Sequence, residues 1–407
     1  MRRVLFVSEA ITLAQMVRLV ALAETLDPKA YKVHFASARF PDLVFGATSF
    51  RRWPLDGVDV ERLHRAHLAG RPMYDTATLR RYVTTDLELF DAVQPHVVVG
   101  DFRWSLTVSA PVARVPHLAL ANAYMSPFAR RDGFPLPEHP ILRLLGERAR
   151  GPFERMLPRV FRRMAAPVNA LRRDHGLAPL DGLLHVLTHG DLTLYCDPPE
   201  LVALDGAPTT HRFVGYVPWA PRTPLPERLP SGERPIVYAT MGSSGDTRAL
   251  TLVIETLTHG FDVDVIAATA GRVRLDERER LFVADYWPGD WVMERAALAI
   301  TNGGSTSGYQ ALAGGVPVLG IPANFEQLVA SRALDTTGAA RSIPGGRVTR
   351  RRLHALTRSL LESDDVHHAA RAVRRSIARL DYRRAFVCAV EDAIAPRVID
   401  ERGAASA

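Results

Sequence analysis

Two series of strand and helix patterns, separated by a proline-rich stretch, constrain this sequence most strongly. In the first series, short runs such as 4–8 (VLFVS) and 96–101 (HVVVGD) are almost wholly apolar and alternate with amphipathic segments. Parallel strands covered by helices on both faces show such continuous apolar runs. Residues 218–235 contain six prolines, and the same alternation restarts at 235–244 (PIVYATMGSS). The sequence therefore predicts two α/β units joined by an extended linker.

The predicted organisation is two tandem doubly wound domains with Rossmann-like parallel sheets. We expect an N-terminal domain over residues 1–217, a proline-rich linker over 218–234 and a C-terminal domain over 235–380. Residues 381–407 should form a helix that packs back on the N-terminal domain, followed by a tail. Ligands of such sheets bind beyond the carboxyl ends of the strands, so the expected site is a cleft between the domains.

Composition excludes several classes of protein. The sequence contains no run of about 18 uncharged apolar residues, so it predicts no transmembrane helix. The first apolar run is too short for a signal peptide, and we therefore expect a cytoplasmic protein. The net charge is +7, yet no basic motif with interleaved aromatic residues predicts nucleic-acid binding. The only cysteines, Cys196 and Cys388, lie in apolar segments and are expected to be buried and unpaired.

The most informative segment is 284–327, where a predicted strand ends at Thr301 and a glycine pair follows. Gly303 and Gly304 allow close approach of the backbone to an anion, and Ser305 and Thr306 open a helix. The N-terminus of a helix offers unpaired N–H groups and the positive end of its dipole. This segment predicts a phosphate site, although it has neither a P-loop lysine nor a GxGxxG spacing.

The same segment resembles the donor-binding signature of family 1, UDP-glycosyltransferase-like enzymes with the GT-B fold, especially bacterial natural-product and macrolide transferases. The matching pieces are an aromatic-Pro stretch (YWP, 286–288), a Gly-Gly loop (NGG, 302–304), Gly-Val-Pro at 315–317 and Glu-Gln at 326–327. The two-domain layout extends the resemblance over nearly the whole chain. It implies an inverting glycosyltransferase that uses a UDP- or dTDP-sugar and a lipophilic small-molecule acceptor, without a metal cofactor.

The resemblance also implies roles for individual residues of the C-terminal half. Tyr286 or Trp287 would stack on the base, and Asn302 stands where the family usually has a phosphate-binding histidine. Gln310 replaces a ribose-binding glutamate, which leaves dTDP-sugars open as donors. The remaining contacts to the phosphates and the sugar hydroxyls would come from Ser243, Ser244, Gly303, Gly304, Ser305, Thr306, Glu326 and Gln327.

The catalytic base is the point at which this sequence departs from the family. Family members carry a histidine in the first strand-to-helix loop, oriented by an aspartate after a later strand. Gln15 occupies the place of the histidine, and Asp101 that of the aspartate. Glutamine has no titratable nitrogen and cannot act as a general base. Three hypotheses remain: Asp101 is the base, the acceptor needs little base, or the protein binds its ligands without efficient transfer.

The N-terminal half is expected to bind the acceptor, through Thr12, Gln15, Met73, Tyr74, Trp104 and Tyr124. An arginine-rich segment at 146–176 allows two interpretations, a helix packed on its own domain or a contact with a membrane surface. The second would make the protein a lipid glycosyltransferase, and Pro152, Pro158 and Pro167 weaken both interpretations. His64 and His67 have a spacing compatible with a metal site, but no second pair lies nearby in the sequence.

Overall fold

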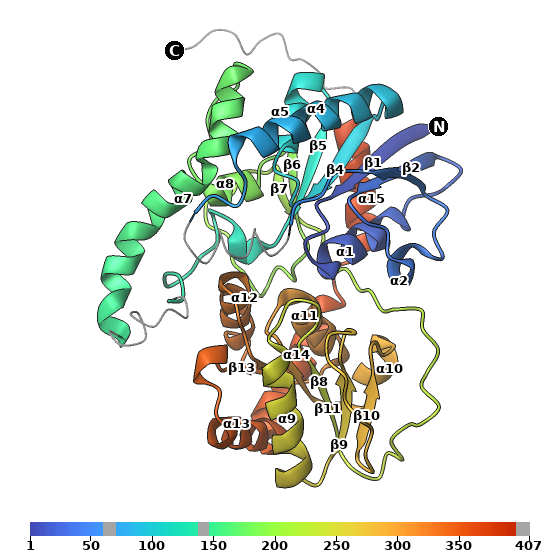
Figure 1. Cartoon of the computed structure of the whole chain (residues 1–407), viewed down its shortest axis with the longest axis vertical. Helices are drawn as coiled ribbons and strands as arrows, with labels where there is room; N and C mark the ends of the chain where they lie inside the picture. Colours follow the sequence, from blue (N-terminus) through green and yellow to red (C-terminus); the bar gives the residue numbers. More distant parts are fainter. Residues whose placement is uncertain (60–70, 137–145, 396–407) are drawn as a thin grey trace.

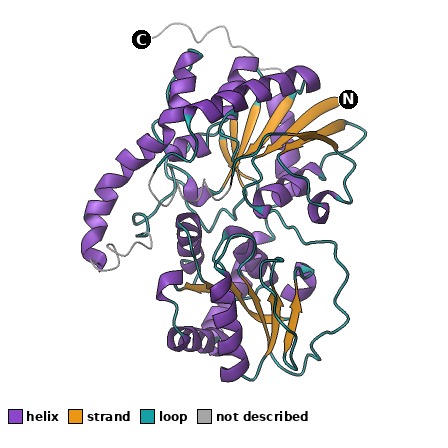
Figure 2. Cartoon of the chain, viewed as in Figure 1, coloured by secondary structure: helices purple, strands orange, loops and turns teal. Residues whose placement is uncertain are grey.

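A computed structural model of the chain describes residues 1–59, 71–136 and 146–395. It contains two α/β domains, each with a parallel sheet between layers of helices (Figures 1 and 2). In the view of Figure 1 the N-terminal domain lies above the C-terminal domain. The predicted fold class is therefore confirmed.

The sheet of the N-terminal domain has the strand order β3-β2-β1-β4-β5-β6-β7 over the described residues, and every pairing is parallel. Its central strands are buried along nearly their whole length, which explains their continuous apolar sequences. The strands are β1 (Arg2–Ser8), β2 (Tyr31–Ser37), β3 (Arg51–Pro54), β4 (Val97–Asp101), β5 (His117–Ala121), β6 (Leu192–Tyr195) and β7 (His211–Phe213).

Helices cover both faces of this sheet. One face packs against α1 (Leu13–Ala23), α2 (Asp42–Phe45) and the C-terminal helix α15 (Tyr382–Ile394), and the other against α4 (Thr76–Val93) and α5 (Leu106–Ala113). The long helix α7 (Arg150–Asp174) and the short α8 (Leu183–Leu187) form a further apolar cluster with α4. Short 3-10 turns occupy Ala123–Met125 and Gly146–Ala149.

The C-terminal domain has a second parallel sheet with the order β10-β9-β8-β11-β12-β13 in the described residues. Its strands are β8 (Ile236–Thr240), β9 (Asp264–Ala268), β10 (Leu281–Ala284), β11 (Ala296–Thr301), β12 (Val318–Gly320) and β13 (Ala340–Ser342). Its helices are α9 (Thr247–Gly260), α10 (Gly289–Met293), α11 (Ser305–Gly314), α12 (Phe325–Asp335), α13 (Arg350–Glu362) and α14 (Asp364–Ile377), with a 3-10 turn at Gly345–Arg347.

Two segments connect the domains. Residues 218–235 run between the domains without a helix or strand, as a long loop along one side of the molecule (Figure 1). Helix α15 returns to the N-terminal domain, where Phe386, Ala389 and Val390 enter the core formed with β1 and α1. The chain therefore crosses between the domains twice.

Several sequence-based details need correction. Helix α7 continues through Pro158 and Pro167, which the sequence analysis had counted against a helix packed on its own domain. Pro152 lies in the first turn, where its missing N–H costs no hydrogen bond, and an extensive apolar face holds the rest of the helix.

Cys388 is exposed, because it points away from the buried face of α15. Strands β3 and β13 were not predicted, whereas His64, His67 and the tail from residue 396 lie outside the described residues.

Candidate active site

The carboxyl ends of the two sheets meet at the interface between the domains. Among the described residues, three side-chain hydrogen bonds cross this interface. The Tyr124 hydroxyl donates to the Glu326 carboxylate and lies 3.1 Å from Ser305 Oγ, whose own hydroxyl can donate to it. The Tyr309 hydroxyl donates to Asp197 Oδ1 at 2.6 Å. Predicted site residues from both halves, including Tyr124, Ser305 and Glu326, are thus brought together.

Gln15, which the sequence analysis placed at the position of the family histidine, caps its own helix. Its side-chain oxygen accepts hydrogen bonds from the backbone N–H of Ile11 at 3.0 Å and of Thr12 at 3.3 Å. Thr12 is the N-cap residue of α1 and Gln15 is the third residue of the helix, which is the geometry of a capping box. The Gln15 side chain therefore satisfies backbone donors that the first turn would otherwise leave unpaired.

Asp101, the last residue of β4, forms an ion pair with Arg18, one turn after Gln15 on α1. The Arg18 guanidinium donates to both carboxylate oxygens, with 2.8 Å from Nη2 to Oδ1. Asp101 is only 1% exposed. Burial raises the pKa of its carboxyl and the Arg18 charge opposes that shift. Burial lowers the pKa of Arg18, but the charge of Asp101 and its hydrogen bonds together outweigh this and raise the pKa, so the guanidinium stays protonated.

A chain of hydrogen bonds continues from this ion pair towards the donor domain. Arg18 donates to Asn122 Oδ1 at 2.9 Å, and Asn122 Nδ2 donates to Asp197 Oδ1 at 3.0 Å. Asp197 also accepts from the backbone N–H of Ala123 and from Tyr309 of α11. Burial raises the pKa of Asp197, and the hydrogen bonds that it accepts oppose the shift. The acceptor side of the interface is thus connected to the helix predicted to bind phosphate.

Sequence analysis missed Arg18, Asn122 and Asp197. A signal was available for Arg18, because it is the only charged residue in the sequence of α1 (LAQMVRLVALA). Asn122 and Asp197 each follow a strand of the sheet directly or closely, where ligand-binding side chains gather in doubly wound folds.

A second buried charge cluster follows β1 and β4. The Arg103 guanidinium lies between Glu9 and Asp86, with Nη1 to Glu9 Oε2 at 3.0 Å and Nη2 to Asp86 Oδ1 at 3.1 Å. Tyr82 donates to Glu9 Oε1 at 2.9 Å, and the guanidinium carbon lies 3.6 Å from the centre of its ring. Burial raises the pKa of Glu9 and the Arg103 charge opposes the shift. The sequence analysis had not identified this cluster.

The predicted acceptor residues do not all lie together. Met73, Tyr74 and Trp104 lie in one apolar cluster, where the Tyr74 and Trp104 rings meet edge to face with centroids 5.0 Å apart. Both rings are buried in this conformation. Tyr124 lies instead at the domain interface beside Glu326. Thr12 begins α1 and is partly exposed.

On the donor side, Asn302 and Gln327 connect three segments at the end of the second sheet. Asn302 Nδ2 donates to the Met241 carbonyl at 3.2 Å, and its Oδ1 accepts from the Gly304 N–H at 3.0 Å. Gln327 Nε2 donates to Ser244 Oγ at 3.1 Å. The MGSS turn, the Gly-Gly loop and the start of α12 therefore lie together.

The Gly-Gly loop has no room for larger residues. Gly303 has φ +70°, and a Cβ there would lie 2.0 Å from Ser331 Oγ. Ser331 Oγ in turn donates to the Gly303 carbonyl at 3.1 Å. Because the backbone conformation and the packing both exclude a side chain, this loop depends on glycine.

The structure distinguishes between the two aromatic candidates for base stacking. Trp287 is buried, and its indole N–H donates to the Ala267 carbonyl at 3.2 Å. Tyr286 is partly exposed, and burial together with Asp285 raises the pKa of its hydroxyl. Of the pair, only Tyr286 therefore retains an accessible ring.

The other predicted donor residues vary in accessibility. Ser243 and Thr306 are exposed, whereas Gln310 donates to the Trp219 carbonyl of the linker at 3.2 Å. Glu326 remains accessible to solvent although it lies deep between the domains. Burial of the carboxyl between the domains raises its pKa, and the hydrogen bond from Tyr124 opposes the shift.

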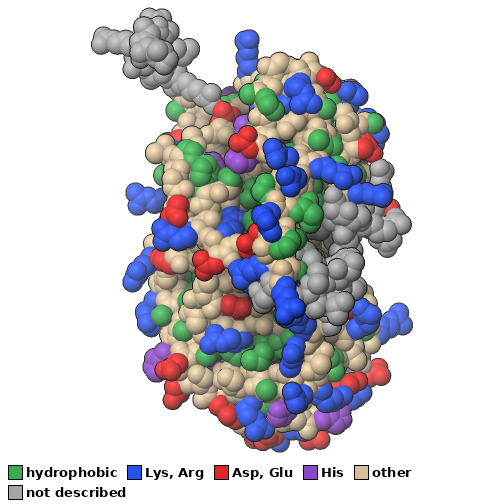
Figure 3. All heavy atoms as spheres, turned by 90° about the vertical axis from the view of Figure 1, so that its left-hand side faces the viewer, with side chains coloured by type: hydrophobic (Ala, Val, Ile, Leu, Met, Phe, Trp, Pro, Cys, Tyr) green, Lys and Arg blue, Asp and Glu red, His purple; other side chains and the backbone are tan. Residues whose placement is uncertain are grey.

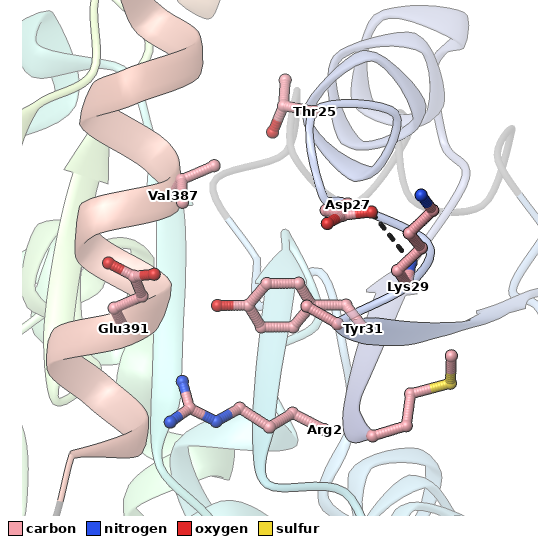
Figure 4. Close-up of a pocket in the computed structure, with 9 residues that line it drawn as sticks. Arg2, Thr25, Asp27, Lys29, Tyr31, Val387 and Glu391 are labelled. Atoms are coloured by element: carbon pink, nitrogen blue, oxygen red, sulfur yellow. Dashed lines mark hydrogen bonds between the residues drawn. The ribbon is translucent and has the colours of Figure 1, made fainter.

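A separate cavity of about 530 Å³ lies at the opposite, amino end of the first sheet. Figure 4 shows Arg2, Asp27, Tyr31 and Glu391 around it, with Asp27 accepting from the Lys29 N–H at 2.9 Å. None of the predicted site residues lines this cavity. We therefore assign it no part in the candidate site.

The described residues contain no cluster of three or more His, Cys, Asp or Glu side chains suited to a metal ion. None of the helices in residues 1–59, 71–136 and 146–395 combines the length and hydrophobicity needed to cross a bilayer.

No family model matches the chain. A "PGL/p-HBAD biosynthesis glycosyltransferase" of Mycobacterium tuberculosis (strain ATCC 25177 / H37Ra) is 43% identical over 377 residues, which cover 91% of this chain and 87% of the relative. A "PGL/p-HBAD biosynthesis rhamnosyltransferase" of Mycobacterium bovis (strain BCG / Pasteur 1173P2) is 40% identical over 384 residues, covering 93% and 85%.

Solved structures share the fold at lower identity. The glycotransferase of kitacinnamycin superposes with a TM-score of 0.71 at 18% identity, covering 96% of this chain and 98% of that one. The spinosyn rhamnosyltransferase SpnG complexed with thymidine diphosphate gives 0.68 at 19% identity, covering 96% and 100%.

Proposed function

Because the chain belongs to the GT-B glycosyltransferases that include the mycobacterial PGL/p-HBAD biosynthesis enzymes, we propose that it glycosylates a hydroxyl group of a lipophilic small molecule. The sugar would come from a dTDP- or UDP-sugar bound by the C-terminal domain. Gln310 in place of a glutamate, and the thymidine diphosphate bound by the structurally similar SpnG, favour dTDP. No metal ion is required in this proposal.

The convergence of Asn302, Ser244 and Gln327 at the N-terminus of α11 is the observation that carries the proposal. Backbone N–H groups and the helix dipole at this point can stabilise the charge of a departing diphosphate. Glu326 and Gln327 would hold the sugar, and Tyr286 would stack on the base. Asn302 supplies a hydrogen bond but no positive charge, so the backbone amides would provide most of the stabilisation.

In the proposed reaction the acceptor oxygen attacks the anomeric carbon from the face opposite the diphosphate. The new C–O bond forms while the bond between the anomeric carbon and the diphosphate oxygen breaks. The electron pair of that bond leaves with the diphosphate, and the anomeric configuration is inverted. The acceptor proton must also be lost.

The ion pair of Arg18 and Asp101 bears on the fate of that proton. Both carboxylate oxygens of Asp101 are engaged by Arg18, and Gln15 caps its helix. We therefore propose that the natural acceptor carries an acidic hydroxyl, such as a phenol, which needs little help from a base. A phenol ionises near pKa 10, far below an aliphatic alcohol. The ion pair would then orient the acceptor loop instead of abstracting a proton.

The test is release of dTDP or UDP from a panel of nucleotide sugars, with phenols of graded acidity and matched aliphatic alcohols as acceptors. Wild type is compared with Gln15→His and Asp101→Asn. We expect wild type to use phenols in preference to alcohols, with a rate that rises with phenol acidity. Gln15→His should extend turnover towards alcohols only if its ring reaches the acceptor.

Other outcomes would change the proposal. If wild type glycosylates alcohols and Asp101→Asn does so about 10²-fold or more slowly, Asp101 is the base. Binding of dTDP without turnover by any variant would favour a sugar-nucleotide-binding protein without transferase activity towards this panel. Failure to bind dTDP or UDP at all would contradict the donor assignment.

A further inference from the structure

Helix α7 is the longest described helix and has two contrasting faces. In Figure 1 it extends along the left side of the molecule, and its first turns project beyond the N-terminal domain. One face is buried and consists of Phe153, Leu157, Met164, Ala165, Val168 and Leu171. Four of these residues, Met164, Ala165, Val168 and Leu171, belong to the apolar cluster that also contains Tyr74 and Trp104.

The opposite face carries Arg155, Arg159, Arg162 and Arg163, which we call the basic face of α7. Their spacing of four, three and one residues places them on one side of a helix, and all four are exposed. No acidic residue occurs between positions 155 and 173. Within the described residues none of the four forms an ion pair. Met156, at 49% exposure, lies beside them.

Figure 3 looks onto this side of the molecule. Lys and Arg side chains are spread over this face, with hydrophobic and some acidic side chains among them. A row of charges on a convex helix, without interleaved aromatic rings or a groove, suits a surface that presents many diffuse negative charges.

Arginine is abundant throughout this chain, so other helices provide a comparison. In α13, Arg350 pairs with Glu255 at 2.9 Å and Arg358 with Glu362 at 4.0 Å. Helix α14 begins with Asp364 and Asp365. In α7 the acidic residues pair elsewhere, Glu154 with Arg150 and Asp174 with Arg80. Among the described residues the basic face of α7 is therefore left without a counter-charge.

The position of α7 connects its basic face to the candidate site. Phe161 of α7 contacts Phe134 with ring centroids 5.4 Å apart, and Phe134 contacts Phe325 of α12 at 5.6 Å. The helix therefore contributes to the predicted acceptor cluster, and Phe134 bridges it to the start of α12, the helix predicted to bind the donor sugar. A surface held by the basic face would lie one helix thickness from the acceptor cluster.

We propose that the basic face of α7 docks the protein on an anionic phospholipid bilayer, from which it takes its lipophilic acceptor. This inference rests on the proposed transfer to such an acceptor. The arginines would contact phosphate headgroups and Met156 would enter the interface. Each arginine near an anionic bilayer raises the partition coefficient by about fivefold. Reversing three of them should therefore weaken binding by at least about 100-fold.

The test is co-sedimentation of the full chain with vesicles of phosphatidylcholine, with and without one third phosphatidylglycerol. Arg155→Glu/Arg159→Glu/Arg163→Glu is compared with Arg351→Glu/Arg371→Glu/Arg375→Glu, which makes the same charge change on exposed residues of α13 and α14. We expect wild type and the second variant to bind the anionic vesicles, and the α7 variant to lose binding by about 100-fold. A single Arg159→Ala, which cannot disturb folding as strongly, should lose about fivefold.

Equal losses in both triple variants would indicate a bulk charge effect and overturn the proposal, as would failure of wild type to bind anionic vesicles. Saturable binding to an acidic protein but not to vesicles would replace the bilayer with a protein partner.

Turnover separates this inference from the proposed function. The α7 variant should glycosylate a water-soluble phenol like wild type and lose activity only when the acceptor is embedded in vesicles. Absence of turnover with both acceptors in wild type would contradict the proposed function and leave the vesicle result standing.

Discussion

The carboxyl ends of the two sheets face each other across the domain interface and differ in their chemistry. They are called here the N-terminal and the C-terminal edge, after the domain to which each belongs. The N-terminal edge is built from buried charges, with Asp101 against Arg18 and Glu9 against Arg103. The C-terminal edge relies on a glycine loop, a helix N-terminus and neutral side chains such as Asn302 and Gln327. Charges must be paired to be buried, whereas a backbone site needs space. The first edge should therefore be sensitive to loss of a partner and to pH, and the second to added atoms.

The largest effect is expected at the ion pair of the N-terminal edge. Arg18→Met leaves the Asp101 carboxylate buried without its counter-charge, which should lower the free energy of unfolding by about 3 kcal/mol. Chemical denaturation measures this change. The double variant Arg18→Met/Asp101→Asn removes both charges and should recover most of the loss. If the double variant is no more stable than the single one, the ion pair is not what stabilises this edge.

The matching test of the C-terminal edge adds one methyl group. Gly303→Ala places a Cβ against Ser331 Oγ in a left-handed backbone conformation, and should weaken dTDP binding at least about tenfold. Gly206→Ala is the control, because Gly206 also has positive φ but a Cβ at this position would meet nothing within 4 Å. The control should lose only about 1 kcal/mol of stability and bind dTDP normally. Titration calorimetry distinguishes the two, and equal loss of binding would contradict the packing argument.

The pH response should reveal buried titratable groups in the N-terminal domain. Burial lowers the pKa of His117 to about 3, so this histidine is neutral when folded but titrates near 6.5 when unfolded. Below pH 6.5 the unfolded state binds more protons, and stability falls as pH decreases. As the pH is lowered from about 8 to about 5, the free energy of unfolding of His117→Gln should therefore fall by about 2 kcal/mol less than that of wild type.

Buried carboxyls with raised pKa, such as Asp197, act in the opposite direction, because the folded state then binds the extra proton. The prediction accordingly concerns the difference between wild type and variant, measured by urea denaturation at each pH. Identical pH profiles for the two proteins would rule out His117 as a contributor.

The smallest effect is expected at Gln15. Gln15→Ala removes the acceptor for the Ile11 and Thr12 N–H groups and should cost about 1 kcal/mol of stability, as loss of a helix cap does. Gln15→Glu keeps an oxygen acceptor at the same position and should retain more of this stability. A stability loss well above 2 kcal/mol in Gln15→Ala would show that the side chain does more than cap α1.

The sequence predicted the architecture because its evidence is local. Continuous apolar runs, turn residues and the proline-rich stretch each reflect the neighbours along the chain, and they were sufficient for two parallel-sheet domains. The glycosyltransferase family was also recognisable, since the glycine loop and the start of α12 lie within one segment, 284–327. The weight given to the prolines against a helix at α7 was misplaced, because tertiary packing of the apolar face outweighs the local cost of proline.

Only the tertiary structure revealed how the side chains at the interface are paired. Arg18 and Asp101 are 83 residues apart, and Tyr124 and Glu326 are 202 apart, so no local pattern connects them. Tyr286 and Trp287 are adjacent in the chain, yet folding buries the indole and leaves the phenol ring accessible. A sequence pattern records which residue types follow one another, whereas ion pairs, caps and accessibility depend on which residues become neighbours when distant strands align.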